Sequence, residues 1–525
     1  MSQRISRALL VLLTMGGQVA AAADWYVETA GNDGNDCTAP GAASACQTIQ
    51  AAIDKASSGD TIHVAAGTYP EPAAGPLAIN KTLTLLGEQS GVDARGRVGP
   101  ESVVADPEGT VVIANDVVID GFTIQESTAG FAGFGLWMGP ATAGTQILND
   151  IIQDNVIGIG LSNAGPSRAL VRHNLIQNNN QPGSASGTGI YTDQFVSGGA
   201  VRNVLIEENA IIGHDDTGID VSNTDPANGV SGLDVSTNAF DGNGRAVVIF
   251  NTQRSAIHGN RVRNSTFATS AAIRVLDNNR DLSIVNNDLM TGVLHAIRMS
   301  DLDFVDPGRP NPSSNVVINE NNFAFFGGDA LLVDPGSHVG TVNAECNWWN
   351  SSTGPMNAGN PTGTGEGVAG DADFTPWLVA PAPGGGCVGG VPSTPGKVTG
   401  GGHIAGVPSD PEPRATFGFE VKCCAPTGNL EYHDHRAGVR IKSQSVDGLL
   451  ISSPGGSCPA TPGSKHARFT GLAAVIRSTG TTTEPFAVDV DDCGEPGTSD
   501  SFGIKTTSYS NGPSTLTGGN IQIHQ

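Results

Sequence analysis

The segment "TIQAAIDKASSGDTIHVAAGTY" at residues 48–69 reads as one short helix followed directly by one short strand. Its apolar residues Ile49, Ala52, Ile53 and Ala56 recur at the spacing of one helix face. A Gly-Asp pair ends the helical pattern, and residues 61–64 then alternate polar and apolar side chains as a strand does. No comparable helical pattern follows in about the next three hundred residues, so one helix must serve a region made mainly of strands.

Two short patterns repeat along most of the chain, which indicates a stacked architecture. In the first, an apolar residue stands three before a polar residue and another apolar residue stands two after it. Its polar positions are Asp120, Asn174, Asn209, Asn238, Asn260, Asn287, Asn321 and Asn347, with Asn149 in the first gap. The second pattern reads "IGIGL", "TGIYT", "TGIDV", "AVVIF", "AAIRV", "HAIRM" and "ALLV", in which apolar residues flank one outward residue.

Each period holds about three short strands, too few to bury their own apolar side. Coils stacked at about 4.8 Å form three parallel sheets around a narrow apolar interior. A buried Asn at each turn can then bond the backbone of the coils on either side, so we interpret the Asn series as a structural ladder. The open ends of such a stack carry unpaired strand edges, and the helix at 48–57 is predicted to cover one of them.

The repeats and the segment "CQTIQAAIDKASSGDTIHVAAGTY" resemble the bacterial right-handed parallel β-helix proteins of the pectin-lyase-like superfamily, over roughly residues 24–380. The segments "CNWWNSSTGP" and "FTPWL" at 374–378 are similar to the ending of many such exported proteins. The resemblance implies that Trp348, Trp349 and Trp377 pack at the closing end of the coil. A stacking platform for sugar is the alternative interpretation of these three side chains.

The chain divides into four predicted segments and its fold class is all-β. Arg4 and Arg7, an apolar run and small residues at 21–23 predict a secretory signal peptide over 1–23. The β-helix follows over 24–380 and a Pro/Gly-rich linker over 381–396. Residues 397–525 resemble an uncharacterised C-terminal β domain of bacterial exported proteins and are expected to form a small antiparallel β-sandwich. No later stretch is long and apolar enough to span a membrane.

The net charge of −24 argues against a nucleic-acid partner, which needs clustered Lys and Arg. An acidic polysaccharide would need a local basic patch or a bridging cation. No lysine occurs from Thr82 to Gly396, so arginine or histidine must supply any positive charge there. We expect a monomer that is secreted or otherwise extracytoplasmic.

Eight cysteines in an exported chain are expected to pair. Cys37 and Cys46 are close in sequence near the new N-terminus. The remaining predicted pairs are Cys346 with Cys387, and Cys423 and Cys424 each with Cys458 or Cys493, in two connectivities that stay open. None of the cysteines has the spacing of a zinc site.

The second repeat pattern aligns a column of outward side chains: Gly160, Tyr191, Asp220, Val248, Arg274, Arg298 and Leu332. The resemblance implies that a substrate lies along the outer face of one sheet, as in the enzymes of the superfamily. Asp193 follows Tyr191 by two residues, and His214, Asp215 and Asp216 lie in the turn that leads to Asp220. His295 stands just before Arg298. The candidate catalytic residues are Asp220, Arg298, Arg274, Tyr191, Asp193 and Asp216.

Two chemistries fit these residue types. A lyase needs a base and a group that stabilises the enolate; here an arginine can pair with a substrate carboxylate, and Asp216 with Asp220 can hold Ca²⁺. A hydrolase needs two carboxyls at a defined distance, and Asp193, Asp216 and Asp220 supply them. "HDDTGIDV" is similar to the Asp-Asp motif of polygalacturonase-type hydrolases, but the companion motifs of that group and the pectate-lyase signatures are absent. An Asp–Arg ladder of ordinary surface pairs is the alternative.

The sequence therefore predicts an exported β-helix protein that binds a polysaccharide or cell-surface glycan, with cleavage left open. A structural or adhesive surface protein is the alternative function. No cofactor is firmly implied, and Ca²⁺ is the one ion considered. In the C-terminal part, "EYHDHR" at 431–436 places His433 and His435 on one strand face, where they suit either a metal or a hydrogen-bonded surface strand.

Overall fold

The structure is a computed structural model that describes residues 22–524, apart from several short segments. The undescribed segments are 71–74, 130–132, 226–228, 303–309, 362, 384, 386–395, 407–413, 423–426, 453–457, 459–463, 498 and 507. The predicted signal peptide and most of the predicted linker therefore lie outside the described residues. The four predicted segment boundaries stay predictions.

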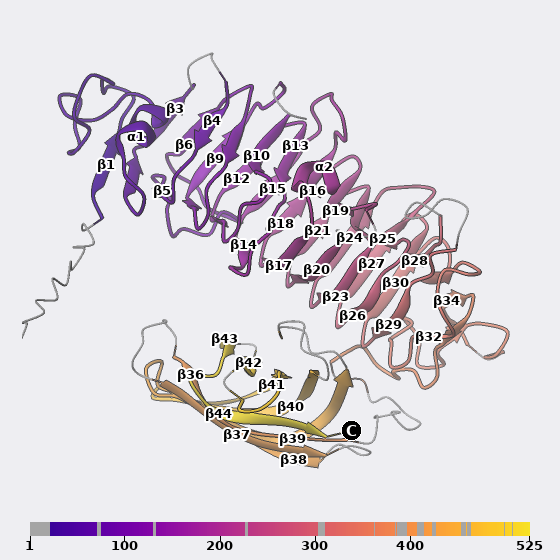
Figure 1. Cartoon of the computed structure of the whole chain (residues 1–525). Helices are drawn as coiled ribbons and strands as arrows, with labels where there is room; N and C mark the ends of the chain where they lie inside the picture. Colours follow the sequence, from indigo (N-terminus) through magenta and orange to yellow (C-terminus); the bar gives the residue numbers. More distant parts are fainter. Residues whose placement is uncertain are drawn as a thin grey trace, which may run out of the picture.

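Parallel strands form three long sheets that wind into one coil (Figure 1). Sheet A contains β1 (Asp24–Val27), β2 (Thr61–Val64), β5 (Thr84–Leu86), β8 (Val118–Asp120), β11 (Gln146–Leu148), β14 (Ala169–Arg172), β17 (Val201–Glu207), β20 (Val230–Ser236), β23 (Thr252–His258), β26 (Arg280–Val285), β29 (Ser314–Asn319), β32 (Val342–Asn343) and β35 (Ala372–Asp373). Sheet B contains β3 (Gly67–Tyr69), β6 (Ser102–Ala105), β9 (Phe122–Gln125), β12 (Ile151–Gln153), β15 (Leu175–Gln177), β18 (Ala210–Ile212), β21 (Ala239–Asp241), β24 (Arg261–Ser265), β27 (Asp288–Gly292) and β30 (Asn322–Phe326). Sheet C contains β4 (Leu77–Ile79), β7 (Thr110–Val112), β10 (Phe134–Met138), β13 (Ile157–Gly160), β16 (Thr188–Thr192), β19 (Thr217–Ser222), β22 (Arg245–Phe250), β25 (Ala271–Val275), β28 (His295–Met299), β31 (Leu331–Val333), β34 (Gly365–Ala369) and β33 (Pro355–Met356).

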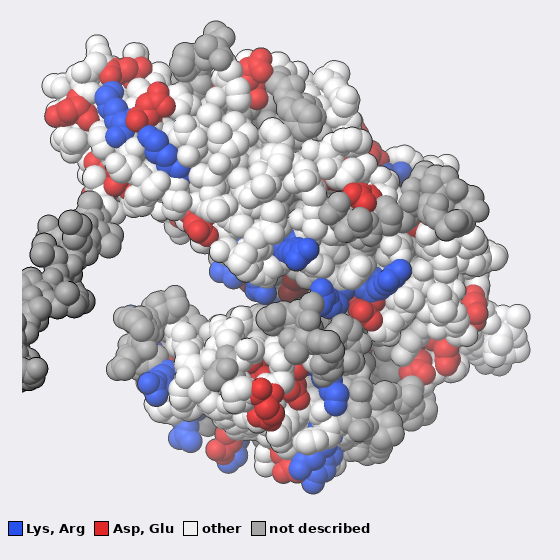
Figure 2. All heavy atoms as spheres, viewed as in Figure 1, with Lys and Arg blue, Asp and Glu red and all other residues white. Residues whose placement is uncertain are grey.

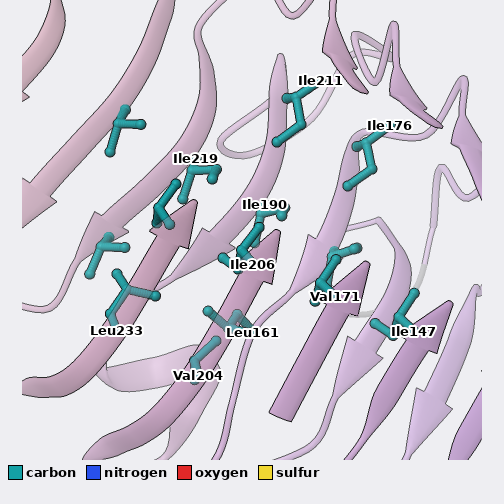
Figure 3. Packing of buried hydrophobic residues seen from close by; sticks show 14 of the residues in the cluster. Ile147, Leu161, Val171, Ile176, Ile190, Val204, Ile206, Ile211, Ile219 and Leu233 are labelled. Carbon is teal, nitrogen blue, oxygen red and sulfur yellow. The ribbon is translucent and has the colours of Figure 1, made fainter. Parts of the chain in front are cut away.

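The interior of the coil is a continuous column of aliphatic side chains. Ile147, Val171 and Ile206 occupy equivalent positions of three neighbouring coils and stack on one another (Figure 3). All three are fully buried. Since every coil repeats this inward pattern, the apolar core follows the whole length of the coil, and the predicted parallel β-helix is confirmed.

Helix α1 (Ile49–Lys55) lies at the N-terminal end of the coil (Figure 1). Thr48 caps it by accepting a hydrogen bond from the backbone N–H of Ala51, and Ile49, Ala52 and Ile53 are its buried residues. Ile49 and Ile53 belong to the same core cluster as the coil interior. The predicted capping helix is therefore confirmed, together with the face that it buries.

A ladder of buried amides lines one turn of the coil, as predicted from Asn174 onward. In each step, the backbone N–H and the side-chain amide of one Asn donate to the side-chain oxygen of the next, as from Asn209 to Asn238 at 3.0 and 2.9 Å. Asn238 continues the series to Asn260, and both are 1% exposed. These bonds satisfy backbone groups that the turn would otherwise leave without a partner.

The start of the ladder differs from the prediction. Asp150, not Asn149, precedes Asn174, because the backbone N–H of Asp150 donates to the side-chain oxygen of Asn174 at 2.7 Å. Asn149 has a φ of 53°, a left-handed conformation that Asn tolerates better than most residues. Asp120 lies outside the ladder as well, where it accepts a hydrogen bond from the Asn149 side chain at 2.8 Å.

Aromatic side chains close the far end of the coil. Trp349 is fully buried against Phe323, with ring centroids 4.9 Å apart. The Trp377 ring lies so close to Gly354 that a β-carbon there would meet it at 2.4 Å, and its indole N–H donates to the Ser352 carbonyl at 3.2 Å. These contacts support packing as the role of Trp349 and Trp377.

The C-terminal strands form one antiparallel sheet in the order β43-β42-β41-β40-β39-β38-β37-β36-β44. Its strands are β36 (Lys397–Ala405), β37 (Arg414–Lys422), β38 (Thr427–Asp434), β39 (Val439–Ser452), β40 (Lys465–Arg477), β41 (Gly480–Asp492), β42 (Ser501–Thr506), β43 (Ser510–Thr515) and β44 (Gly518–His524). The Asn511 side chain on β43 donates to the Ala405 carbonyl on β36 at 2.9 Å, so the two ends of the sheet approach each other. The antiparallel β domain is confirmed, but a single curled sheet stands where two stacked sheets were expected, because its long strands twist and bulge at Ser443/Ser445.

Two disulfide bonds are described in full, Cys37–Cys46 and Cys458–Cys493. The first is as predicted. The second shows that the predicted pairing of Cys423 and Cys424 with Cys458 or Cys493 was wrong, since the two later cysteines bond each other. Cys346 is disulfide-bonded too. Its predicted partner Cys387 lies outside the described residues, as do the adjacent cysteines Cys423 and Cys424.

Among the helices in the described ranges, none is long and apolar enough to cross a membrane.

Candidate functional site

The outward column predicted from the repeats exists on sheet C. Strand pairing places Tyr191 beside Asp220, Asp220 beside Val248, Val248 beside Arg274 and Arg274 beside Arg298. Gly160 and Leu332 continue the column on either side. The flanking residues in these five strands are at most 1% exposed, so the pleat directs the column to the outer face.

The acidic half of the column is built around a short helix, α2 (Gln194–Ser197). The side chain of Asp193 caps this helix by accepting hydrogen bonds from the N–H groups of Phe195 and Val196 at 2.8 and 2.7 Å. Its other oxygen accepts from the Tyr191 hydroxyl at 3.0 Å. Asp193 therefore positions Tyr191 and α2 on the face of sheet C.

The phenol of Tyr191 is kept neutral by its surroundings. Burial raises the pKa of Tyr191, and the nearby carboxylates of Asp193 and Asp220 raise it further. Tyr191 also packs with Trp137 against the buried residue Val196. At neutral pH this side chain can donate a hydrogen bond, but it is not a base.

Asp220 is a carboxyl poised near neutral pH. Burial raises its pKa to about 6, and the charges of Asp216 and Asp193 act in the same direction. The hydroxyl of Ser222 donates to Oδ1 of Asp220 and opposes the shift, as does the charge of Arg245. A carboxyl with such a pKa can both give and take a proton at neutral pH.

Asp216 is held by an arginine that sequence reasoning missed. A guanidinium nitrogen of Arg245 donates to Asp216 Oδ1, and Arg245 Nε donates to the Ser270 hydroxyl at 3.0 Å. The guanidinium also lies over the Phe267 ring, 3.9 Å from its centroid. The period that aligns Asp220 with Val248 also aligns Thr217 with Arg245, so the sequence did contain this signal.

The basic half of the column contains two unlike arginines. Arg298 forms an ion pair with Asp334 at 2.9 Å, and the Ser300 hydroxyl donates to the same oxygen of Asp334. Arg274 has no hydrogen-bond or ion-pair partner in the described part of the chain, and its Nε is buried without an acceptor. Burial lowers the pKa of Arg274 to about 10, and the charge of Arg298 lowers it too.

Val248 separates the two halves. It is 5% exposed and packs with Phe250 and Leu276 in a small cluster on the outside of the sheet. The face is therefore divided along the coil axis into an acidic part, a short apolar part and a basic part.

Two histidines near the column do not join it. His214 is fully buried and replaces an Asn in a second ladder, where its ring contacts Asn179 and Asn243 at 3.2 and 2.9 Å. Burial lowers the pKa of His214 to about 4, so it is neutral. His295 is 8% exposed, and its ring bonds the Asp329 carbonyl at 2.7 Å.

The carboxylates of Asp216 and Asp220 are already partly engaged by other side chains, which bears on Ca²⁺ binding. One oxygen of Asp216 is engaged by Arg245 and one oxygen of Asp220 by Ser222. Within the described ranges, no three His, Cys, Asp or Glu side chains form a group that can hold a metal ion. The donor set therefore does not fit a bound cation as it stands, and dependence on Ca²⁺ stays a prediction.

The outer face of sheet B offers a contrast. Gln125, Gln153 and Gln177 form a ladder of side-chain hydrogen bonds at 3.1 and 2.8 Å. The strands of this sheet run across the middle of Figure 1, and the matching surface in Figure 2 is mostly uncharged. This amide ladder is uncharged, whereas further along the same sheet Arg263 pairs with Asp288 at 2.8 Å.

Residues 109–289 match the family described as "Right handed beta helix region". That part of the chain is a right-handed β-helix. Among curated protein sequences, none matches the chain.

Several solved structures are similar to parts of the chain. The A-module of the mannuronan C-5 epimerase AlgE6 of Azotobacter vinelandii is 15% identical, with 57% of this chain and 89% of the module covered and a TM-score of 0.37. Pectate lyase Pel9A is 14% identical, with 69% and 80% covered and a TM-score of 0.34. The catalytic unit of a GH87 alpha-1,3-glucanase from Streptomyces thermodiastaticus is 14% identical, with 62% and 70% covered and a TM-score of 0.37. At these identities the likeness concerns the fold alone.

Proposed function

We propose that the protein binds an acidic polysaccharide along the outer face of sheet C. The observation that supports this most is Arg274, a partly buried guanidinium without a partner, one coil from Arg298. Folding gains nothing from a buried cation left unpaired, whereas a carboxylate of a ligand would accept from its fork-shaped donors. Two adjacent arginines in a chain of net charge −24 form a local site of the opposite sign.

The shape of the column suits an extended polymer. Tyr191 and Arg298 are separated by four coil steps, or about 19 Å at the usual strand spacing. A polymer on this face would meet hydroxyl and carboxyl groups at one end and guanidinium groups at the other. In this proposal Arg274 and Arg298 contact an acidic group, and Asp220 serves as the proton-transfer group if a bond is cleaved. The Tyr191 oxygen, whose proton is donated to Asp193, accepts a hydrogen bond from a sugar hydroxyl.

We also propose an extracytoplasmic location. Two described disulfide bonds support it, because such bonds persist in oxidising compartments.

The test is a panel of uronic-acid polymers and matched neutral polymers, each with Ca²⁺ and with a chelator. We expect saturable binding to at least one acidic polymer and none to its neutral counterpart. Cleavage is followed by reducing ends and by the absorbance of unsaturated uronic products, which separates hydrolysis from elimination. Binding to no polymer, or equal binding to acidic and neutral polymers, would contradict the proposal and favour a structural or adhesive role.

A further inference from the structure

A pair of histidines lies on the outer face of the C-terminal sheet. Along β38, Leu430, Tyr432 and Asp434 are buried, so the alternate residues Glu431 and His433 point outward. His435 follows in the turn after the strand and is exposed. The ring centroids of His433 and His435 are 3.8 Å apart.

The backbone beneath these rings is well anchored. Oδ1 of Asp434 accepts hydrogen bonds from the N–H groups of Arg436 and Ala437, both at 2.9 Å, which fixes the turn. Oδ2 of Asp434 accepts from the Tyr509 hydroxyl at 2.7 Å inside the curled sheet. The residue between the two histidines is thus tied to the core, which anchors the backbone on either side of it.

The ring nitrogens of His433 and His435 have few hydrogen-bond partners among the described residues. The nearest described side-chain contact is His435 Nε2 with the Thr416 hydroxyl, at 3.5 Å. Neither ring forms an ion pair with a carboxylate in the ranges that the structure describes.

We propose that His433 and His435 bind a single divalent transition-metal ion such as Zn²⁺. Imidazole nitrogens bind Zn²⁺ at about 2.0–2.1 Å, so two that share one ion are no more than about 4 Å apart, which the close approach of the rings permits. The two rings are tilted by 41° to each other, so rotation about the side-chain bonds has to turn one nitrogen of each ring toward the ion. Glu431 lies on the same face, but Lys442 holds its carboxylate at 2.8 Å, so the protein supplies two ligands and leaves the remaining positions open.

The test is calorimetric titration of the full-length mature protein with Zn²⁺ at neutral pH. We expect one saturable site per chain, and we expect H433A/H435A to bind Zn²⁺ at least about tenfold more weakly, since both first ligands are gone. The matched control is H403A/H524A, which removes two other histidines of the same sheet and should leave the affinity unchanged. Far-UV circular dichroism and thermal melting confirm that each variant is folded.

Two results would overturn the proposal. One is a wild-type protein that shows no saturable Zn²⁺ binding. The other is equal affinity in the wild type and H433A/H435A, which would place any bound ion elsewhere among the eleven histidines of the chain.

Discussion

Replacing Asn238 with Leu tests the buried ladder that fixes the register of the coil. The side-chain oxygen of Asn238 accepts from the backbone N–H of Asn209, and its amide donates to the Ile206 carbonyl at 2.8 Å. Leu keeps the branched heavy-atom skeleton of Asn, and its larger methyl groups can only add to the cost of the lost hydrogen bonds. The Asn209 N–H loses its acceptor inside the protein at about 2 kcal/mol, and the lost donation to Ile206 adds about 1 kcal/mol. We therefore expect N238L to lower the free energy of unfolding by about 3 kcal/mol.

Tryptophan fluorescence during denaturant titration measures this cost in the coil alone, since all five tryptophans lie between residues 25 and 377. The control is A239L, which introduces the same side chain one residue further along, at an exposed position of β21. We expect A239L to change stability by less than about 0.5 kcal/mol. The reasoning is refuted if N238L and A239L have the same free energy of unfolding, because the hydrogen bonds of the ladder would then not stabilise the coil.

The remaining predictions concern the site and the domain boundary. Asp220 has a raised pKa of about 6, so the folded protein binds this proton more tightly than the unfolded chain and loses stability as pH rises from about 4 to about 7. D220N should then equal the wild type near pH 4 and exceed it near pH 8 by up to about 3 kcal/mol in urea titrations; a pH-independent difference would contradict the shift. R274A should keep wild-type stability within about 0.5 kcal/mol, because it removes no described bond. R245A removes the bonds to Asp216 and Ser270 and should lower the melting temperature clearly. An equal decrease in melting temperature for R274A and R245A would contradict the difference in their contacts. Brief proteolysis should cut within 381–396 and release a C-terminal fragment that stays folded with its Cys458–Cys493 bond, whereas a fragment that unfolds at once would mean a shared core.

The column on sheet C could be predicted because inward and outward side chains alternate along each strand. Apolar residues on both sides of Asp220, Arg274 and Arg298 must point inward, so these three must point outward. Tyr191 has an apolar residue before it and Thr192 after it, and the shared period places it in the same column. One coil period then fixes which side chains are neighbours. The same reasoning applies to Arg245, which was missed because the repeat was read only at its central position.

The start of the Asn ladder could not be predicted from the spacing of the repeats. Asp150 takes the place of an Asn in the ladder, and burial raises its pKa well above the usual value. The sequence analysis chose the adjacent Asn149 to fill the gap between Asp120 and Asn174. The outcome is set by backbone conformation: residue 149 is left-handed, like His173, Glu208 and Thr237, which also precede ladder positions.

The curled C-terminal sheet shows a similar limit. The resemblance implied an antiparallel β domain, but whether strands split into two sheets or bend as one depends on twist and bulges along β39 and β40. The hydrogen bonds of Tyr432, Tyr509 and Asn511 join distant strands across its interior. Pairs so far apart in sequence cannot be found from local pattern alone.

The central claim, that the outer face of sheet C binds the polymer, is tested most directly by comparing two double variants. R274A/R298A removes the basic half of the column, and R261A/R263A removes two arginines from the outer face of sheet B. The affinity of both and of the wild type for an acidic oligosaccharide chosen from the panel is measured by calorimetry. We predict that R274A/R298A loses at least about a hundredfold in affinity, or about 2.7 kcal/mol, while R261A/R263A binds like the wild type. Equal affinity in all three proteins, or a greater loss in R261A/R263A, would contradict the claim.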